Sequence, residues 1–544
     1  MTLCSAASTD WLQFGFDPTH SGINPNETLL SADNVDLLAL KYSKTFSVPA
    51  QGTPVFLSNV STLLGVIDLL FVTLNDGSLL ALNAADGAQV WANLPTSIPL
   101  CGQAGQNPQC LVTSSPAIGP NRNYVYNFSR VDGKIHKFAV ATGAETVDAH
   151  WPEVSSTKPD VEKGSSAITF ATSSTDPNHD TYLYMTHSSF LANDGGDYQG
   201  HITAINLRTG AQIVFNAVCS DQGNIHFIEA GTISGANQTD CYQAQTTNDS
   251  GDPVPAGNAG IWGRAAATYD PASDSIYIST ANGVYDPTNM FNYGGSFWGD
   301  SVLRLPAALS SELLEPLDSY TPPNFDGLMR NDTDLGSASL AIIPVSMTTD
   351  YAYTHLGIQA GKDSNIRIID LDDMSIANGP QWTETVHESA LYTASVPQEN
   401  EVKTQPLIWQ NPANGNVMVI VSNDFGISAM QLIMDGSNNP QLSNTPASWI
   451  LTGSSLPHGE TYGGGSPIIA NNVLYYASAS GLIALDPATG NILAAKTEMG
   501  LSTTAPGVFH KQSPIVVNGR VYVTDENNNL WVYEGDEIFP NGFD

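Results

Sequence analysis

One phrase recurs along this 544-residue chain: an apolar strand, a turn, a second strand and a short Asp-Gly or Thr-Gly turn. The clearest copy is DLLFVTLNDGSLLALNAADGAQVW at 68–91, and further copies begin near 123, 180, 274, 352, 416, 472 and 519. Alternating apolar residues predict strands, and the N-D-G, V-D-G and A-T-G turns predict antiparallel hairpins. Eight copies about 60 residues apart therefore predict an all-β protein, an eight-bladed β-propeller with four antiparallel strands in each blade.

The two ends of the chain complete this prediction. The final copy, GRVYVTDENNNLWVYE (519–534), lacks a closing strand, which LLALKYSKTF (37–46) could supply. We expect a single propeller domain over 37–544 and an N-terminal leader or clasp over 1–36, in which His20 is structural. A pair of β-sandwiches is the alternative, but it does not predict so many copies of one phrase.

Charge excludes whole classes of partner. The chain has 18 Lys and Arg against 53 Asp and Glu, a formal net charge of −35. Such a field repels nucleic acid and anionic membrane surfaces. No apolar run approaches the roughly 18 residues of a membrane-spanning helix. We therefore expect neither a nucleic-acid partner nor a membrane span, and any Lys or Arg in a pocket becomes informative.

The five cysteines are unevenly spaced. Cys101 and Cys110 flank one polar loop, and Cys219 and Cys241 flank another, so two disulfides are plausible, with Cys4 unpaired. Free thiols in a reduced compartment are the alternative. No C-x-x-C pair encodes a zinc ribbon or a covalently attached haem. The start, MTLCSAASTDW, reads as a mature N-terminus with an added Met, and the expected location is secreted or periplasmic.

The repeat also resembles a known family. ALNAADGAQVW (81–91) is similar to the A-x-D-x-x-T-G-x-x-x-W docking motif of pyrroloquinoline-quinone (PQQ) dehydrogenase propellers, and AINLRTGAQIVF and ALDPATGNIL are copies without the Trp. The resemblance covers roughly residues 60–535. It implies a quinoprotein that oxidises an alcohol or sugar hydroxyl with PQQ and Ca²⁺. Because a haem-binding motif is absent, electrons would leave to a separate acceptor.

The segment GIWGRAAATYDPASDSIYISTANG (260–283) resembles the part of quinoprotein alcohol dehydrogenases that holds the quinone. The resemblance implies that Trp262 is the platform under the quinone and Asn282 a Ca²⁺ ligand, with Arg264 as a quinone-side cation. The chemistry is consistent, because a planar tricarboxylate favours an aromatic platform and cations, and a hard cation favours oxygen ligands.

Two later segments extend the resemblance. GIQAGKDSNIRIIDL (357–371) is similar to the segment whose cation contacts the quinone oxygens, which would be Lys362. RNDTDLGSASLAIIP (330–344) is similar to the segment with the catalytic carboxylate, which would be Asp334 or Asp332, with Asp334 also a metal ligand. The family's Glu ligand should fall within 187–201, where this chain has no Glu, and Asp194 or Asp197 could substitute. The adjacent cysteine pair of many members is also absent.

Two other functions fit the same sequence. A propeller without a cofactor could bind glycans or proteins through its loops, and each candidate residue has an ordinary structural role open to it. A copper-type enzyme could use histidines of the central channel, with His187, His355, His458 and His510 as candidates, although no H-x-H or H-x₃-H pair occurs.

Overall fold

The structure of the protein is a computed structural model. The described residues are 10–95, 112–159, 161–189, 198–220, 258–265, 267–290, 295–310, 313, 315–383, 385–443, 448–452, 463–478, 481–499 and 511–535, with the backbone of 245–247 and 253–255.

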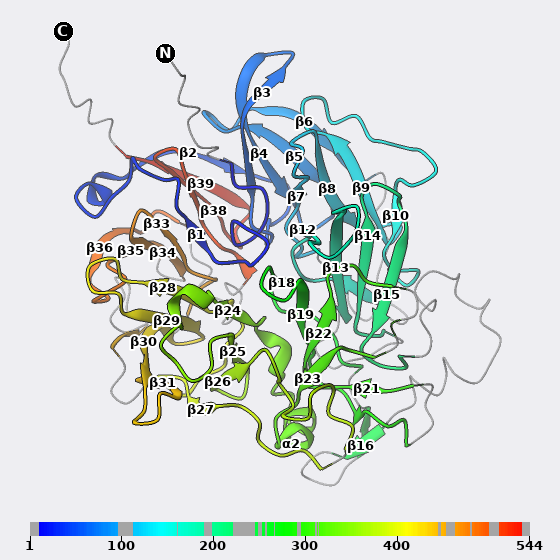
Figure 1. Cartoon of the computed structure of the whole chain (residues 1–544). Helices are drawn as coiled ribbons and strands as arrows, with labels where there is room; N and C mark the ends of the chain where they lie inside the picture. Colours follow the sequence, from blue (N-terminus) through cyan, green and yellow to red (C-terminus); the bar gives the residue numbers. More distant parts are fainter. Residues whose placement is uncertain are drawn as a thin grey trace.

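Eight sheets, each built mainly of four antiparallel strands, surround one axis, which confirms the predicted propeller (Figure 1). The first four blades contain the following strands: β3 (Val55–Thr62), β4 (Gly65–Thr73), β5 (Leu79–Asn83) and β6 (Gln89–Asn93); β7 (Ala117–Ile118), β8 (Tyr124–Ser129), β9 (Lys134–Ala139) and β10 (Glu153–Val154); β11 (Glu162–Gly164), β12 (Thr169–Thr172), β13 (Thr181–Ser189), β14 (His201–Asn206) and β15 (Gln212–Asn216); β18 (Thr268–Asp270), β19 (Ser275–Ser279), β22 (Val302–Pro306) and β23 (Asp318–Tyr320).

The last four blades follow the same order of strands along the chain. They contain β24 (Ala341–Ile343), β25 (Leu356–Ala360), β26 (Asn365–Asp370) and β27 (Tyr392–Ser395); β28 (Leu407–Gln410), β29 (Val417–Asn423), β30 (Gly426–Met434), β31 (Pro440–Ser443) and β32 (Trp449–Thr452); β33 (Ile468–Ala470), β34 (Val473–Ser478), β35 (Gly481–Leu485) and β36 (Ile492–Lys496); β37 (Ile515–Val517), β38 (Arg520–Thr524) and β39 (Asn529–Glu534).

Small elements lie between these strands. The described ones are β16 (Gln245–Thr247) paired with β17 (Pro253–Pro255), β20 (Tyr285–Asp286) paired with β21 (Phe297–Trp298), helix α2 (Phe325–Arg330), and the 3₁₀ turns Val35–Leu37, Leu335–Ser337 and Val345–Met347. No helix in the described ranges is long and apolar enough to cross a membrane.

The N-terminal strand closes the ring, as the sequence predicts. β2 (Ala39–Thr45) pairs antiparallel with β39 and becomes the outer strand of the eighth blade. Lys41 forms an ion pair with Glu534 across this junction. β1 (Ile23–Asn24) pairs in parallel with β33 of the seventh blade. The termini of the propeller are thus joined through two sheets.

The segment before β2 also binds several other blades. Trp11 exchanges backbone hydrogen bonds with Phe56 of the first blade. His20 is buried, and its ring nitrogens reach the carbonyl of Phe14 at 2.7 Å and the hydroxyl of Thr169 at 3.0 Å. Burial lowers the pKa of His20, which favours the neutral ring. These contacts connect the leader to the first and third blades.

Apolar contacts between neighbouring blades form the core. The indole of Trp91, at the end of the first repeat, donates a hydrogen bond of 2.8 Å to the carbonyl of Val140 in the second blade. A Cβ on Gly143 would lie 2.6 Å from that indole, and the φ of Gly143 is 69°. Trp449 packs against Gly490 in the same manner. The tryptophan of the preceding blade therefore packs directly on the glycine of the Thr-Gly turn.

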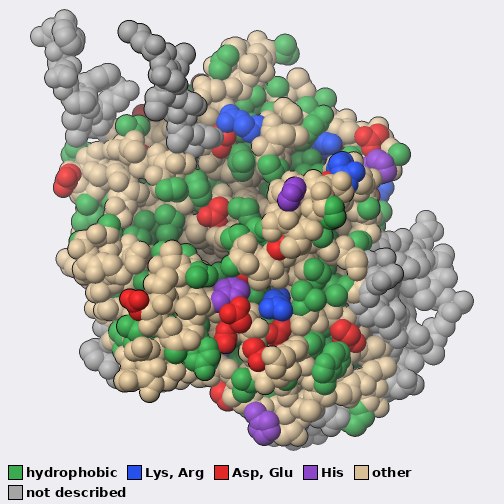
Figure 2. Space-filling model, in the orientation of Figure 1, with side chains coloured by type: hydrophobic (Ala, Val, Ile, Leu, Met, Phe, Trp, Pro, Cys, Tyr) green, Lys and Arg blue, Asp and Glu red, His purple; other side chains and the backbone are tan. Residues whose placement is uncertain are grey.

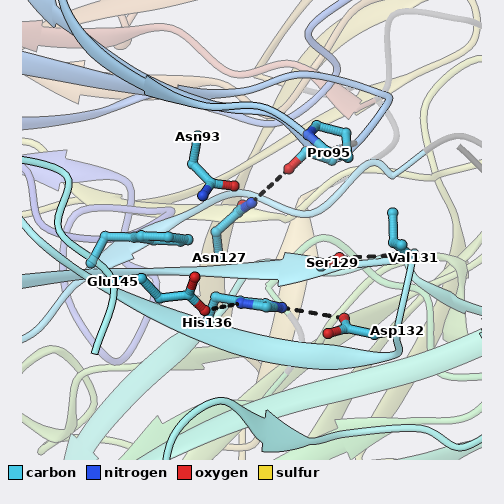
Figure 3. A pocket seen from close by; sticks show the side chains of 10 residues that line it. Asn93, Pro95, Asn127, Ser129, Val131, Asp132, His136 and Glu145 are labelled. Atoms are coloured by element: carbon cyan, nitrogen blue, oxygen red, sulfur yellow. Dashed lines mark hydrogen bonds and ion pairs between the residues drawn. The ribbon is translucent and has the colours of Figure 1, made fainter. Parts of the chain in front are cut away.

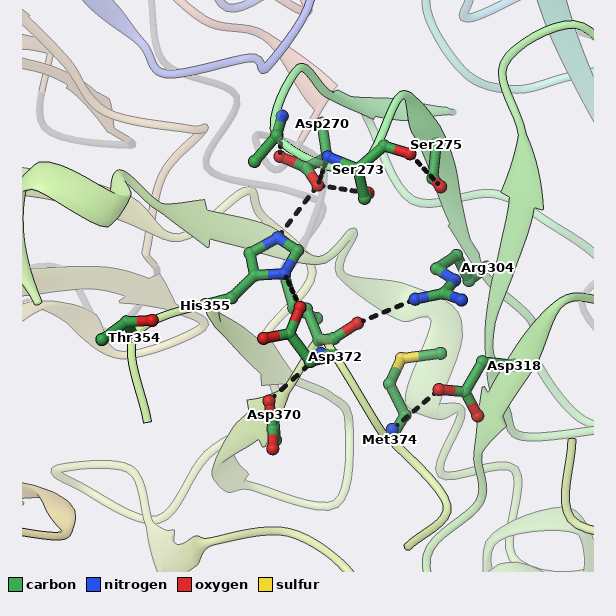
Figure 4. Close-up of polar contacts among 12 residues, drawn as sticks. Asp270, Ser273, Ser275, Arg304, Asp318, Thr354, His355, Asp370, Asp372 and Met374 are labelled. Atoms are coloured by element: carbon green, nitrogen blue, oxygen red, sulfur yellow. Dashed lines mark hydrogen bonds and ion pairs between the residues drawn. The ribbon is translucent and has the colours of Figure 1, made fainter. Parts of the chain in front are cut away.

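A buried ionic contact joins the fourth and fifth blades (Figure 4). His355 places its Nε2 atom 2.9 Å from Asp270 and its Nδ1 atom 2.8 Å from Asp372. Burial opposes protonation of His355, but the two carboxylates outweigh it and raise the pKa of the ring.

Figure 2 shows acidic side chains, a histidine and a basic side chain near the centre of one face of the molecule.

Candidate functional site

Trp262 lies just before β18, the innermost strand of the fourth blade, and its side chain is only partly buried. The adjacent Gly263 permits a close approach to the fifth blade, because a Cβ at that position would lie 2.5 Å from the Ser339 hydroxyl and 3.0 Å from its backbone nitrogen. The Trp-Gly pair therefore places an indole with an accessible surface at the start of an axial strand.

Asn282 is hydrogen-bonded to the segment that contains Asp332 and Asp334. The backbone N–H of Asn282 donates to a carboxylate oxygen of Asp334 at 2.9 Å, and its side-chain amide donates to Asp332 at 2.8 Å. Gly336, in the 3₁₀ turn that follows Asp334, would place a Cβ 2.4 Å from the backbone of Thr280. This close approach fixes Asp334 against the end of β19. Asn282 and Asp334 are buried, whereas Asp332 is exposed.

Lys362 completes the group from the turn between β25 and β26. Its Nζ atom lies 2.6 Å from Asp334 and 3.4 Å from Asp332, and 5.3 Å from the centroid of the Trp262 ring. Burial disfavours the ammonium, but the charge of Asp334 outweighs burial and raises the pKa of Lys362. Burial and the charge of Asp334 raise the pKa of Asp332. A cation thus lies over an aromatic ring and beside two carboxylates.

Asp300 belongs to the same group and was not predicted. It is fully buried before β22, with φ at 48°, and one carboxylate oxygen accepts from the backbone N–H of Leu335 at 3.0 Å. Burial, reinforced by the charge of Asp334, raises its pKa well above the usual range. The sequence signal was the Gly-Asp pair before a strand, where an acidic residue looks like an ordinary turn former.

The other predicted residues lie elsewhere. Arg264 is buried, and its guanidinium donates to the carbonyls of Thr113 at 2.8 Å and Ser165 at 2.9 Å. Asp194 and Asp197 lie outside the described residues, so their predicted role as metal ligands stays a prediction. Trp262, Asn282, Asp332, Asp334 and Lys362, which come from three segments of the chain, are brought together.

The group fits a planar anion better than it fits a complete cation cage. Trp262 and Lys362 offer the aromatic surface and positive charge that suit an anionic quinone. The side-chain oxygen of Asn282 and the second carboxylate oxygen of Asp300 are buried and have no hydrogen-bond partner among the described residues. These two oxygens are the donors that Ca²⁺ favours. Among all the described residues, however, no three His, Cys, Asp or Glu side chains are placed to hold a metal ion.

The histidines do not form a copper site in the described part of the chain. His187 and His201 stack with ring centroids 4.4 Å apart, and His187 contacts the Ser155 hydroxyl at 2.6 Å. His355 is engaged by the two aspartates of the blade junction. His458 and His510 lie outside the described residues.

Most of the cysteines also lie outside the described residues. Cys219 is buried and disulfide-bonded. Its predicted partner Cys241, like Cys4, Cys101 and Cys110, lies outside the described residues, so the two pairings stay predictions.

A polar cavity of about 150 Å³ lies between the first two blades (Figure 3). His136 lines the cavity, with its Nδ1 atom 2.6 Å from Glu145 and its Nε2 atom 3.2 Å from Asp132. Phe138 stacks on His136 at 6.0 Å, and Asn93 and Asn127 line the same cavity. The cavity thus combines hydrogen-bonding groups with one aromatic ring.

Comparisons with known proteins place the fold. No family model matches the chain, and no curated protein matches it in sequence. Among solved structures, it is similar to the quinohemoprotein alcohol dehydrogenase ADHIIG from Pseudomonas putida HK5 (TM-score 0.58, 14% identity, covering 97% of this chain and 80% of that one). It is also similar to the quinohemoprotein alcohol dehydrogenase from Comamonas testosteroni (0.57, 15%, 99% and 83%) and to a europium-containing methanol dehydrogenase (0.57, 12%, 96% and 98%). At these identities the likeness establishes the fold alone.

Proposed function

We propose that this protein is a quinoprotein-like oxidoreductase that oxidises an alcohol or a sugar hydroxyl with PQQ and Ca²⁺. The observation that carries the proposal is the convergence of Trp262, Lys362 and Asp334, because Lys362 contacts both the indole ring and the carboxylate. Three segments predicted separately from the sequence supply these side chains. A structural role alone would not require them to meet.

Each side chain has a distinct task in this proposal. Trp262 would form the platform under the quinone, and Lys362 would hold its oxygens through charge. When bound, PQQ supplies the acceptor for the two electrons of the alcohol. Asp334, as the base, would accept the hydroxyl proton of the substrate. Asn282 and Asp300 would offer oxygen ligands to Ca²⁺, with Asp194 or Asp197 as further candidates.

Two features of the surroundings complete the proposal. The sequence lacks a C-x-x-C-H haem motif, so electrons would pass to a separate acceptor. A secreted or periplasmic location agrees with the proposed disulfides, since such bonds persist in oxidising compartments.

The test is reconstitution. Purified protein is incubated with PQQ and Ca²⁺, and reduction of an artificial dye is followed with a panel of alcohols and sugars. The expected result is substrate-dependent reduction that Asp334→Asn abolishes while quinone binding persists. Asp33→Asn, at an exposed position in the leader, is the matched control. Absence of both quinone binding and dye reduction in the wild type contradicts the proposal.

A binding function is the second candidate, favoured by the cavity around His136. Its asparagines, carboxylates and the Phe138 ring are groups that recognise sugars through hydrogen bonds and ring contacts. Glycan-array binding that is lost in Asn127→Ala and kept in Asp334→Asn would favour this function. Binding that survives Asn127→Ala would count against the cavity.

A further inference from the structure

Three basic side chains from different blades meet on the propeller axis. They are Lys163 in β11 of the third blade, Arg264 just before β18 of the fourth, and Lys511 just before β37 of the eighth. The side chains of Lys163 and Lys511 interact with each other, and the charge of Arg264 acts on both. The fourth and eighth blades are opposite in a ring of eight. Their side chains can therefore meet only across the central channel.

Arg264 has no acidic partner among the described residues. Only 2% of the residue is exposed, and its terminal nitrogens contact the neutral oxygens of Thr113, Ser165 and Ser115. Its Nε–H is buried and has no hydrogen-bond partner among the described residues. Burial lowers the pKa of Arg264 to about 10, so the guanidinium still carries its charge at neutral pH. One donor of a charged group is therefore left without an acceptor in the described part of the chain.

The two lysines are also short of negative charge. Two ammonium groups repel each other, so the interaction of Lys163 with Lys511 favours the neutral form of one of them. Burial and the neighbouring charge of Lys511 lower the pKa of Lys163 well below its usual range. Glu526 is a carboxylate that acts on both lysines, and it is held by Gln51 at 2.7 Å and Gln512 at 2.8 Å. Burial raises the pKa of Glu526, which further weakens this compensation.

We propose that Lys163, Arg264 and Lys511 form an axial binding site for a small polycarboxylate anion. Cations supplied by two neighbouring blades and by the blade opposite match an anion whose charges point in several directions, as in a di- or tricarboxylate, better than they match one compact charge centre. The chain has only 18 basic residues, so the gathering of three on the axis is a costly arrangement unless an anion offsets their repulsion.

Two sources of carboxylate fit the site. One is a free polycarboxylate. The other is the set of carboxylates on a quinone stacked against Trp262, which lies two residues before Arg264. The second source rests on the proposed function, whereas the first does not. An anion seated between the lysines allows both to be charged, so its binding takes up a proton.

The test is calorimetric titration of the full-length protein with citrate, in two buffers of different ionisation enthalpy. We expect saturable binding with proton uptake. Lys163→Met and Lys511→Met should each weaken citrate binding about tenfold or more, because each removes a charge-assisted contact. Lys163→Met should also abolish the proton uptake. Lys163→Arg, which keeps the positive charge, should retain the affinity of the wild type for citrate. Lys44→Met, on the outer strand β2 of the eighth blade, is the control with the same change of charge.

PQQ provides the second arm. Competition between PQQ and citrate identifies the quinone carboxylates as occupants of the axial site, and independent binding of citrate identifies a free polycarboxylate. If citrate does not bind but PQQ binding falls about tenfold in both methionine variants, the site serves the quinone alone. If citrate binds and PQQ does not, the axial site stands and the proposed function fails.

The proposal is overturned if neither ligand binds, or if both lysine variants bind like the wild type. Methionine removes the charge of a partly buried lysine and keeps the length of the side chain, so these variants are expected to fold. Their thermal unfolding, measured beside Lys44→Met, separates lost binding from lost structure.

Discussion

Asp300 is completely buried, and one of its carboxylate oxygens has no hydrogen-bond partner in the described part of the chain. An isolated buried carboxylate is costly unless it is protonated or meets a cation. The side-chain oxygen of the neighbouring Asn282 likewise has no hydrogen-bond partner among the described residues, while its amide N–H₂ donates to Asp332. Both open oxygens are of the kind that Ca²⁺ favours as ligands.

We therefore expect Asp300→Asn to weaken Ca²⁺ binding about tenfold or more, since it removes a negative oxygen ligand. Calorimetric titration with Ca²⁺ measures the change, and Asp33→Asn is again the control. Unaltered Ca²⁺ affinity in Asp300→Asn would remove this residue from the site.

A second prediction concerns the glycines that pack against the inter-blade tryptophans. Gly143→Ala adds a methyl group 2.6 Å from the Trp91 ring at a φ of 69°, whereas Gly415→Ala meets open space at a φ of 78°. Both substitutions carry the strain of a left-handed residue, about 1–2 kcal/mol. Gly143→Ala adds overpacking, so its loss of unfolding free energy should exceed that of Gly415→Ala by about 1–3 kcal/mol. Equal losses of unfolding free energy, measured by urea denaturation, would show that Gly143 and Trp91 are not tightly packed.

At the scale of elements, His355 connects two blades through Asp270 and Asp372. The pKa of His355 is raised in the folded protein, so its stabilising contribution is complete below the ordinary histidine value of about 6.5 and disappears as pH rises through the folded pKa. Burial opposes the negative charge of Asp270, but its bonds to His355 and Ser273 outweigh it and lower its pKa, so the pair survives moderate acid.

His355→Gln should therefore lower the unfolding free energy by about 2 kcal/mol near pH 6, and by progressively less as pH rises. Urea denaturation across this range measures the difference from the wild type. His179→Gln, at an exposed position, should show no such trend. A deficit that is constant or increases with pH would mean that the neutral ring makes the contact.

At the scale of the whole molecule, closure depends on β2, which supplies the outer strand of the eighth blade. Removal of residues 1–46 would expose the edge of β39, and an unpaired edge invites association with another chain. We expect such a chain to unfold at lower temperature and to elute as oligomers in size-exclusion chromatography. A chain that starts at Asp10 is the control. A stable monomer without β2 would contradict closure by the N-terminal strand.

The eight-fold architecture could be predicted from the sequence because each hairpin repeats its alternation and its turn residues. The convergence of Trp262, Asn282, Asp334 and Lys362 could be anticipated only through the resemblance, since nothing local places strand ends of two blades together. Asp300 and the axial lysines were missed for a physical reason. Their significance comes from burial and from neighbours across the channel, which composition and periodicity do not encode.

The most direct test of the proposed quinone site is an equilibrium titration with PQQ in the presence of Ca²⁺, followed by the absorbance of the quinone and by tryptophan fluorescence. The proposed site predicts saturable binding near one PQQ per chain, with quenching that is lost in Trp262→Ala. Lys362→Met should weaken the binding about tenfold, and Lys44→Met should leave it unchanged. No saturable binding by the wild type, or equal binding by Trp262→Ala, would contradict a quinone site at this position.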